Sequence, residues 1–156
     1  MKKLYKIFDG ITMAVFVAMV LVVVLQIIFR FILRISVPWT EELSRLLFIY
    51  IGFFGTAIAV REKELIVIDL LLQRVPAKVQ KVLNVCIYIL SFAFFTVLLV
   101  GGIGVFRKVK DTYFATMSFV SNGWIYIALI VGMGMTLLDM VYSVVVKIRE
   151  RVRDEQ

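Results

Sequence analysis

The sequence predicts an all-α integral membrane protein with four transmembrane helices and one or two short interfacial amphipathic helices. Hydrophobic residues make up 62% of its 156 residues, whereas soluble domains contain about 45–50%. Charged residues are only 19% and mostly flank long apolar runs. Four of these runs are long enough to cross a hydrocarbon core of about 30 Å at about 1.5 Å per residue. We expect one membrane domain over residues 1–156, with spans at about 11–33, 41–60, 82–106 and 124–146 and an interfacial helix at about 62–75.

The first two spans are predicted to form an antiparallel hairpin. Only a short connection, residues 36–40, separates them, and so short a link keeps neighbouring helices side by side. The second span opens with Pro38, Trp39 and Thr40, and we expect Thr40 to be its N-cap. Glu41 and Glu42 follow in the first turn, where carboxylates complement the positive end of the helix dipole.

Two connections differ in character from the spans. Residues 61–81 are basic, and their apolar middle is too short to cross a bilayer, so it is predicted to lie on the membrane until Pro76 ends it. Residues 107–123 mix polar and aromatic side chains and are expected to hold a second short surface helix. The residues expected to anchor the chain at the interface are Trp39, Arg61, Asp69 and Trp124.

The distribution of basic residues predicts the orientation. The N-terminus, the 61–81 connection and the C-terminal tail contain 12 lysines and arginines, and the opposite side contains 6. Because short cytoplasmic loops are enriched in Lys and Arg, both termini are expected in the cytoplasm. The net charge of +7 therefore reflects these flanks, and we predict no nucleic-acid partner.

Arg30 and Asp139 are ionisable residues inside predicted spans, where charges are costly and commonly functional. They lie at different depths and cannot pair. Arg30 is level with Glu41 and Glu42, so we predict an interhelical ion pair there; the alternative is that Arg30 extends to the headgroups.

The role of Asp139 stays open. It could meet Arg61 or Asn84 near the cytoplasmic side, or it could face a partner subunit. A coupling-ion site is disfavoured, because one carboxylate without supporting ligands binds a cation poorly.

Small residues recur at helical spacing in two spans, where they let helices approach closely. The sequence leaves open whether these faces pack within the chain or receive a partner. The residues predicted to pack against a helix or partner are Trp39, Gly52, Gly55, Ala59, Ala128 and Gly132.

The inventory of side chains argues against an enzyme. The chain has no histidine and one cysteine, Cys86, which excludes bis-histidine haem and an internal disulfide. No nucleophile with a base, phosphate loop or metal cluster is evident, so we expect no catalytic residue, cofactor or metal. No internal repeat is present either, which disfavours an inverted-repeat transporter. A small autonomous four-helix transporter or channel remains the alternative, followed by a membrane anchor of a redox enzyme.

One stretch carries a family resemblance. Trp39-Thr40-Glu41-Glu42 is followed by Gly52, Gly55 and Arg61, then by Ile66-Val67-Ile68-Asp69 and Pro76. This order resembles the DctQ-like small membrane subunit (Q subunit) of tripartite ATP-independent periplasmic (TRAP) transporters. The chain departs from the family at Leu65, where a histidine is usual, so no role of that histidine can be transferred.

The resemblance implies a membrane scaffold subunit in the bacterial inner membrane. Such a subunit packs beside a large TRAP membrane subunit that carries the substrate and sodium sites and works by an elevator motion. A periplasmic substrate-binding protein delivers an organic acid, such as a C4-dicarboxylate or sialic acid, for sodium-coupled symport. The resemblance thus implies that sodium coupling lies in the partner subunit, and that this chain scaffolds and anchors that subunit in membrane lipid.

Overall fold

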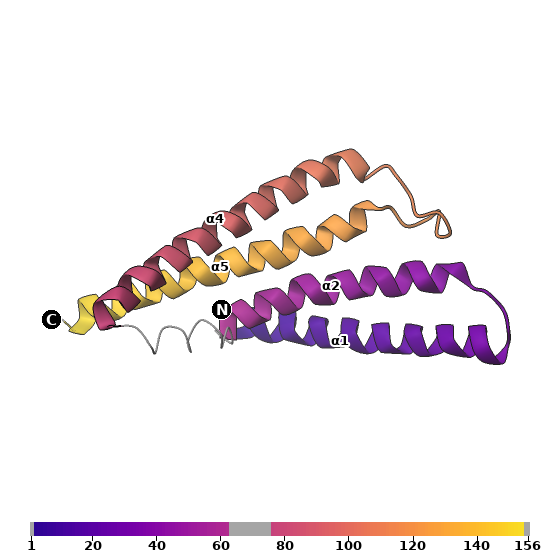
Figure 1. The fold of residues 1–156 in the computed structure, drawn as a ribbon, viewed down its shortest axis with the longest axis horizontal. Helices are drawn as coiled ribbons and strands as arrows, with labels where there is room; N and C mark the ends of the chain where they lie inside the picture. The colour runs from indigo at the N-terminus through magenta and orange to yellow at the C-terminus, as the bar shows by residue number, and fades with distance from the viewer. Residues whose placement is uncertain (1, 63–75, 155–156) are drawn as a thin grey trace.

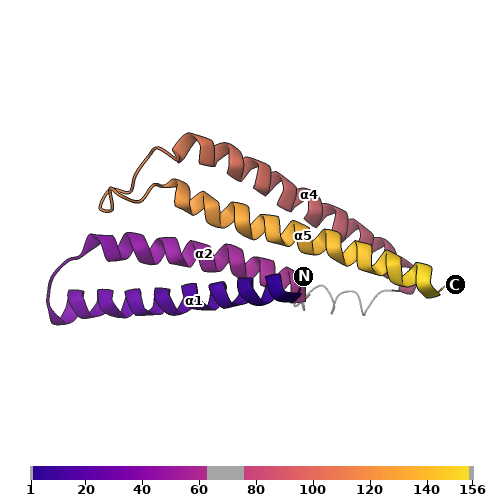
Figure 2. The same cartoon turned by 180° about the vertical axis from the view of Figure 1, so that it is seen from behind.

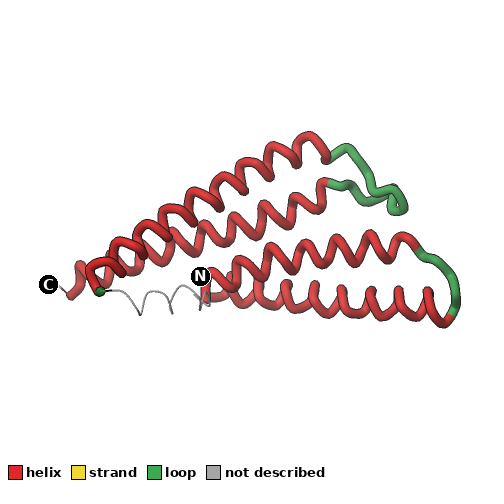
Figure 3. Tube along the Cα trace, viewed as in Figure 1, coloured by secondary structure: helices red, strands yellow, loops and turns green. Residues whose placement is uncertain are grey.

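The computed structural model describes residues 2–62 and 76–154. Within them it contains four long helices: α1 (Lys2–Ile27), α2 (Pro38–Glu62), α4 (Ala77–Val109) and α5 (Gly123–Asp154). A short π-helix, η1 (Ile28–Ile32), extends α1. Figure 3 shows that the remaining described residues are connections. The predicted interfacial helix at about 62–75, with Asp69, lies outside the described residues.

Each of the four long helices contains a segment long and apolar enough to cross a membrane. The candidate spans are 3–32, 38–62, 82–109 and 123–146. This result confirms the prediction of a helical protein with four long apolar helices as candidate membrane spans. The helices also run beyond the predicted spans: α4 begins before residue 82, and α5 continues past residue 146.

The four helices stand side by side in the order α1, α2, α5, α4, as both Figure 1 and Figure 2 show. Helix α2 packs against α1 and α5, and α4 packs against α5. We call the α2–α5 contact the seam, because it joins the α1–α2 hairpin to the α4–α5 hairpin. The row leaves much of the apolar surface uncovered. In the most apolar stretch of α1 no residue is buried, and in that of α5 only 33% of the residues are buried.

Gly132 allows the close approach at the seam. A Cβ atom added to Gly132 would lie 2.8 Å from the carbonyl oxygen of Phe53 and 2.9 Å from its Cβ. Real Cβ atoms do not come so close to backbone, so only glycine fits without a shift. Ala128, one turn earlier on α5, is fully buried. Both residues were predicted to pack against a helix or a partner, and in the structure both are buried.

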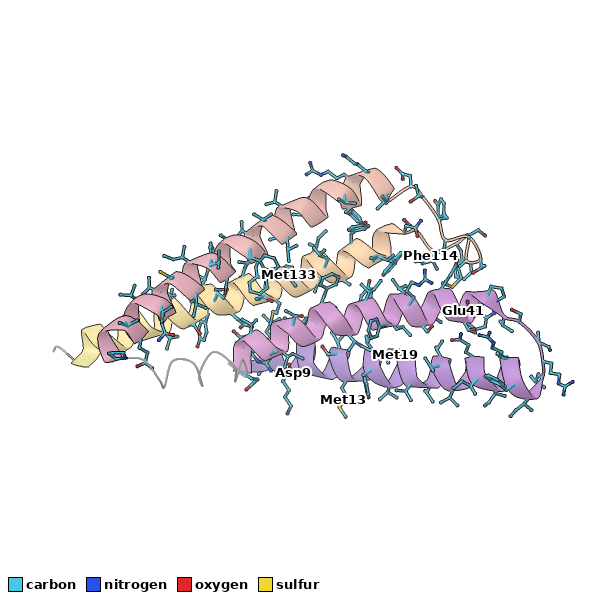
Figure 4. All side chains as sticks on the ribbon, viewed as in Figure 1. Asp9, Met13, Met19, Glu41, Phe114 and Met133 are labelled. Atoms are coloured by element: carbon cyan, nitrogen blue, oxygen red, sulfur yellow. The ribbon has the colours of Figure 1, made fainter. Side chains whose placement is uncertain are left out.

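Apolar side chains fill the space on both sides of the seam. Phe8 of α1 packs against Phe54 of α2 with the rings tilted and their centres 4.9 Å apart, and Met135 of α5 belongs to the same cluster. Another cluster joins α4 to the seam, with Phe95 and Met133 buried in it, and Figure 4 labels Met133 between these helices. Packing of this kind, rather than a closed four-helix core, holds the row together.

The start of α2 differs from the prediction. The helix begins at Pro38, where a missing N–H costs nothing and the fixed φ favours a first helical residue. Thr40 is therefore inside the helix, and its hydroxyl donates to the carbonyl of Val37 at 2.7 Å. The prediction that Thr40 is the N-cap is wrong.

The connection between α4 and α5 also differs from the prediction. Residues 110–122 form turns and one isolated antiparallel bridge, between Tyr113 and Ser121, so the expected second surface helix is absent from this segment. The side-chain amide of Asn122 donates to the backbone carbonyl of Tyr113 at 3.2 Å. The backbone N–H of Asn122 donates to the backbone carbonyl of Thr112 at 2.8 Å. These bonds satisfy backbone groups that a helix would pair internally.

Gly132→Ala is expected to destabilise the subunit in detergent by about 1–3 kcal/mol, the usual cost of forcing an extra group into close packing. The added methyl would press on the backbone of Phe53, which cannot rotate away. Thermal unfolding followed by size-exclusion chromatography measures the effect. Gly134→Ala is the matched control, because a Cβ there meets nothing within 4 Å. Equal melting temperatures for the two variants would contradict the close approach at the seam.

Candidate functional site

Arg61, in the last turn of α2, joins the two helices of the first hairpin. Its Nη1 and Nη2 donate to the two carboxylate oxygens of Asp9 in α1, at 2.9 and 3.0 Å. Its Nε donates to Glu62 at 3.0 Å, and the guanidinium lies 5.1 Å from the centre of the Tyr5 ring. Paired parallel bonds of this kind fix orientation as well as distance. Figure 4 labels Asp9 at this end of α1.

Asp139 of α5 lies near this cluster and is only 6% exposed. It lines a cavity of about 320 Å³, which we call the Asp139 cavity. The Tyr5 hydroxyl is buried at the same cavity and makes no hydrogen bond with a described residue. The Asp139 cavity is lined by Tyr5, Val60, Arg61, Tyr88, Asp139, Met140, Tyr142 and Ser143.

Glu42 makes the main polar contact at the opposite end of the row. Its carboxylate accepts hydrogen bonds from the backbone N–H groups of Thr116 and Met117, at 3.1 and 3.2 Å, and from the Thr116 hydroxyl. Tyr50 of α2 adds a bond from its hydroxyl to the carbonyl of Trp124, at 3.0 Å. The second glutamate of the Trp-Thr-Glu-Glu sequence therefore holds the 110–122 connection against α2.

Arg30 and Glu41 lie at the same end of the first hairpin. Nη1 of Arg30 is 4.0 Å from Oε1 of Glu41, and the two side chains are 69% and 57% exposed. Exposed pairs at this distance contribute little. Glu42, the other predicted partner, bonds to the 110–122 connection instead. The ion pair of Arg30 stays a prediction.

The other predicted packing residues are less enclosed than Ala128 and Gly132. A Cβ at Gly52 or Gly55 would meet nothing within 4 Å, and Ala59 is half-buried. Gly52 lines a shallow apolar groove of about 440 Å³ between α2 and α5. The predicted anchors Trp39 and Trp124 are exposed, whereas the Arg61 side chain is only 16% exposed because it points into the polar cluster.

The sequence analysis missed Asp9 and Thr116. Asp9 lies 26 residues before Ile35 and Arg61 lies 26 residues after it, so hairpin symmetry about the connection could have predicted their contact. No comparable signal links Thr116 to Glu42, because the path of an irregular connection does not follow helical spacing. Within residues 2–62 and 76–154, no cluster of three or more His, Cys, Asp or Glu side chains could hold a metal ion.

The geometry is that of a helical membrane protein whose polar contacts tie helix ends together. Comparison with known proteins gives the family. Residues 19–150 match the family described as the DctQ component of tripartite ATP-independent periplasmic transporters. The chain is also 31% identical, over 129 residues and 83% of its length, to the sialic acid TRAP transporter permease protein SiaT of Haemophilus influenzae (strain 86-028NP).

The chain belongs to the DctQ family, so it is a membrane component of a TRAP transporter and not an enzyme. It spans about a fifth, 21%, of the length of SiaT. A tripartite transporter has further components, and this chain corresponds to one of them.

Glu42→Gln is expected to loosen the 110–122 connection while α2 and α5 stay folded. The amide side chain loses the negative charge that strengthens the bonds from Thr116 and Met117. Hydrogen exchange measured by mass spectrometry should accelerate at these two amides. Glu41→Gln serves as the control, because Glu41 approaches Arg30 and not the connection. Unchanged exchange in Glu42→Gln would contradict the role assigned to the carboxylate.

Proposed function

We propose that this chain is the small permease subunit of a sodium-coupled TRAP transporter, and that it scaffolds and anchors the large elevator-type membrane subunit. The observation that carries the proposal is the single row of four helices with broad uncovered apolar faces. A row exposes more apolar surface than a closed bundle, and that surface must meet lipid or another protein. A subunit of this shape can lie alongside a larger membrane body.

The polar contacts support a rigid role. The Arg61–Asp9 pair fixes the crossing of α1 and α2 at one end. At the other end, Glu42 and Tyr50 fasten α2 to the second hairpin. A scaffold beside a moving partner must resist being dragged with it, and contacts at both ends oppose sliding between helices.

The transported substrate is proposed to be an organic acid, of the C4-dicarboxylate or sialic acid type. Similarity to a sialic acid permease supports this class. Sodium and substrate are proposed to bind the large subunit.

The chain is proposed to sit in the bacterial inner membrane with both termini in the cytoplasm. The 12:6 distribution of Lys and Arg supports this orientation. Paired alkaline phosphatase and green fluorescent protein fusions after Pro76 and Gln156 should both report a cytoplasmic position. Phosphatase activity at either site would reject the orientation.

The chain is expected to be required for uptake without binding substrate itself. Purified alone, it should neither bind an organic acid nor pass sodium, because the proposed sites lie in the large subunit. Reconstituted with the large subunit and the binding protein, it should be needed for sodium-driven uptake of labelled sialic acid or C4-dicarboxylate, which should fall to background when it is omitted.

The same measurements separate this proposal from the small autonomous transporter. Vesicles that contain only this chain, at matched protein content, are the control. Sodium-dependent uptake or a sodium current in those vesicles would overturn the scaffold proposal. So would full uptake by the large subunit and the binding protein alone.

A further inference from the structure

The Asp139 cavity has the composition of a site for an organic cation. The Asp139 side chain at its wall is 6% exposed, and three tyrosines, Tyr5, Tyr88 and Tyr142, line the same space. A carboxylate attracts a cation by charge, and aromatic rings add cation–π attraction to ammonium and guanidinium groups. The hydroxyl of Tyr5 is buried without a well-formed hydrogen bond to a described residue, so it can accept one from an incoming N–H group.

The charges around the cavity do not balance among the described residues. Arg61 is on the wall, but its nitrogens already bond both oxygens of Asp9 and one oxygen of Glu62. Arg61, the basic residue of the cavity lining, is therefore already paired with carboxylates other than Asp139. A buried carboxylate without a counter-charge is costly, and a second cation in the cavity would remove this cost.

We propose that the Asp139 cavity receives a lysine or arginine side chain of the large membrane subunit, which pairs with Asp139 when the subunits assemble. This inference rests on the proposed function, because it needs the large subunit as a partner. A basic side chain inside a membrane span itself requires an acidic partner. The pairing would thus satisfy one costly charge on each subunit at the same contact.

Two other occupants fit the cavity less well. A bare sodium or calcium ion needs several oxygen ligands that converge at about 2.3–2.6 Å, whereas this space of about 320 Å³ offers one carboxylate and scattered hydroxyl groups. A lipid ammonium is attached to a phosphate, which the Asp139 carboxylate in the cavity wall would repel. A long side chain that ends in a cationic group has neither defect.

The test is assembly of the intact complex with Asp139→Asn, which removes the charge and keeps the shape. The co-purification yield of the large subunit should fall about tenfold, as expected when one member of a desolvated charge pair is lost. Asp111→Asn is the matched control: it makes the same change at an exposed carboxylate of the 110–122 connection, away from the cavity lining, so the yield should stay near wild type.

A second substitution identifies the partner charge. Each lysine and arginine in the spans of the large subunit is replaced by glutamine in the Asp139→Asn background. One replacement should restore most of the lost yield, because it removes the charge that Asp139→Asn leaves unpaired. The melting temperature of the isolated Asp139→Asn subunit in detergent shows whether the subunit itself remains folded.

The outcomes are distinct. If wild-type chain does not co-purify with the large subunit, the proposed function fails. If wild type co-purifies and Asp139→Asn does so equally well, the pairing is wrong. The pairing is also wrong if the isolated Asp139→Asn subunit is unfolded to an extent that accounts for the whole loss of yield. It is wrong as well if no replacement in the large subunit restores assembly.

Discussion

The seam between α2 and α5 is the contact on which the rest of the structure depends. The two hairpins meet there, and Gly132 removes the side chain that would hold their backbones apart. In lipid, apolar surface alone gives little reason for helices to associate, so close backbone approach must supply dispersion energy instead. If α5 stood farther from α2, the Phe8–Phe54–Met135 cluster would lose its third helix, and Glu42 could not reach the 110–122 connection.

Packing and polar contact are divided along the length of the helices. The middle of the row is held by apolar side chains and small residues, where an unpaired polar group would be costly. Ion pairs and hydrogen bonds are gathered near the ends, at Arg61 and at Glu42. Asp139 lies at the Arg61 end as well, but its carboxylate is buried, and Arg61, the basic residue of its cavity lining, already bonds Asp9 and Glu62.

The sequence predicted the helices better than their arrangement. Long uncharged runs and a short connection are enough to predict four candidate spans and the first hairpin, and the structure has four such helices and the α1–α2 hairpin. The order of the row could not be predicted, because nearly every face of these helices is apolar and no single stripe marks a core. Gly52, Gly55 and Gly132 look alike in the sequence, yet only Gly132 touches another backbone. Glu42 was predicted, with Glu41, as a partner of Arg30 because all three lie at the same depth. Its contact with Thr116 could not be predicted, since the course of residues 110–122 leaves no periodic pattern in the sequence, whereas the Asp9–Arg61 pair follows from the symmetry of a hairpin.

The row has a consequence for how the protein folds. Within each hairpin the contacts are between helices that follow each other in the sequence, but the seam joins residues far apart, such as Glu42 and Thr116, which are separated by 74 positions. The first hairpin can therefore insert and close while the ribosome is still synthesising α5. Until α5 arrives, the flank of α2 around Phe53 has only lipid to cover it. Assembly is thus ordered in time: the surface of α2 that packs most closely in the finished protein first faces lipid, before α5 has been inserted.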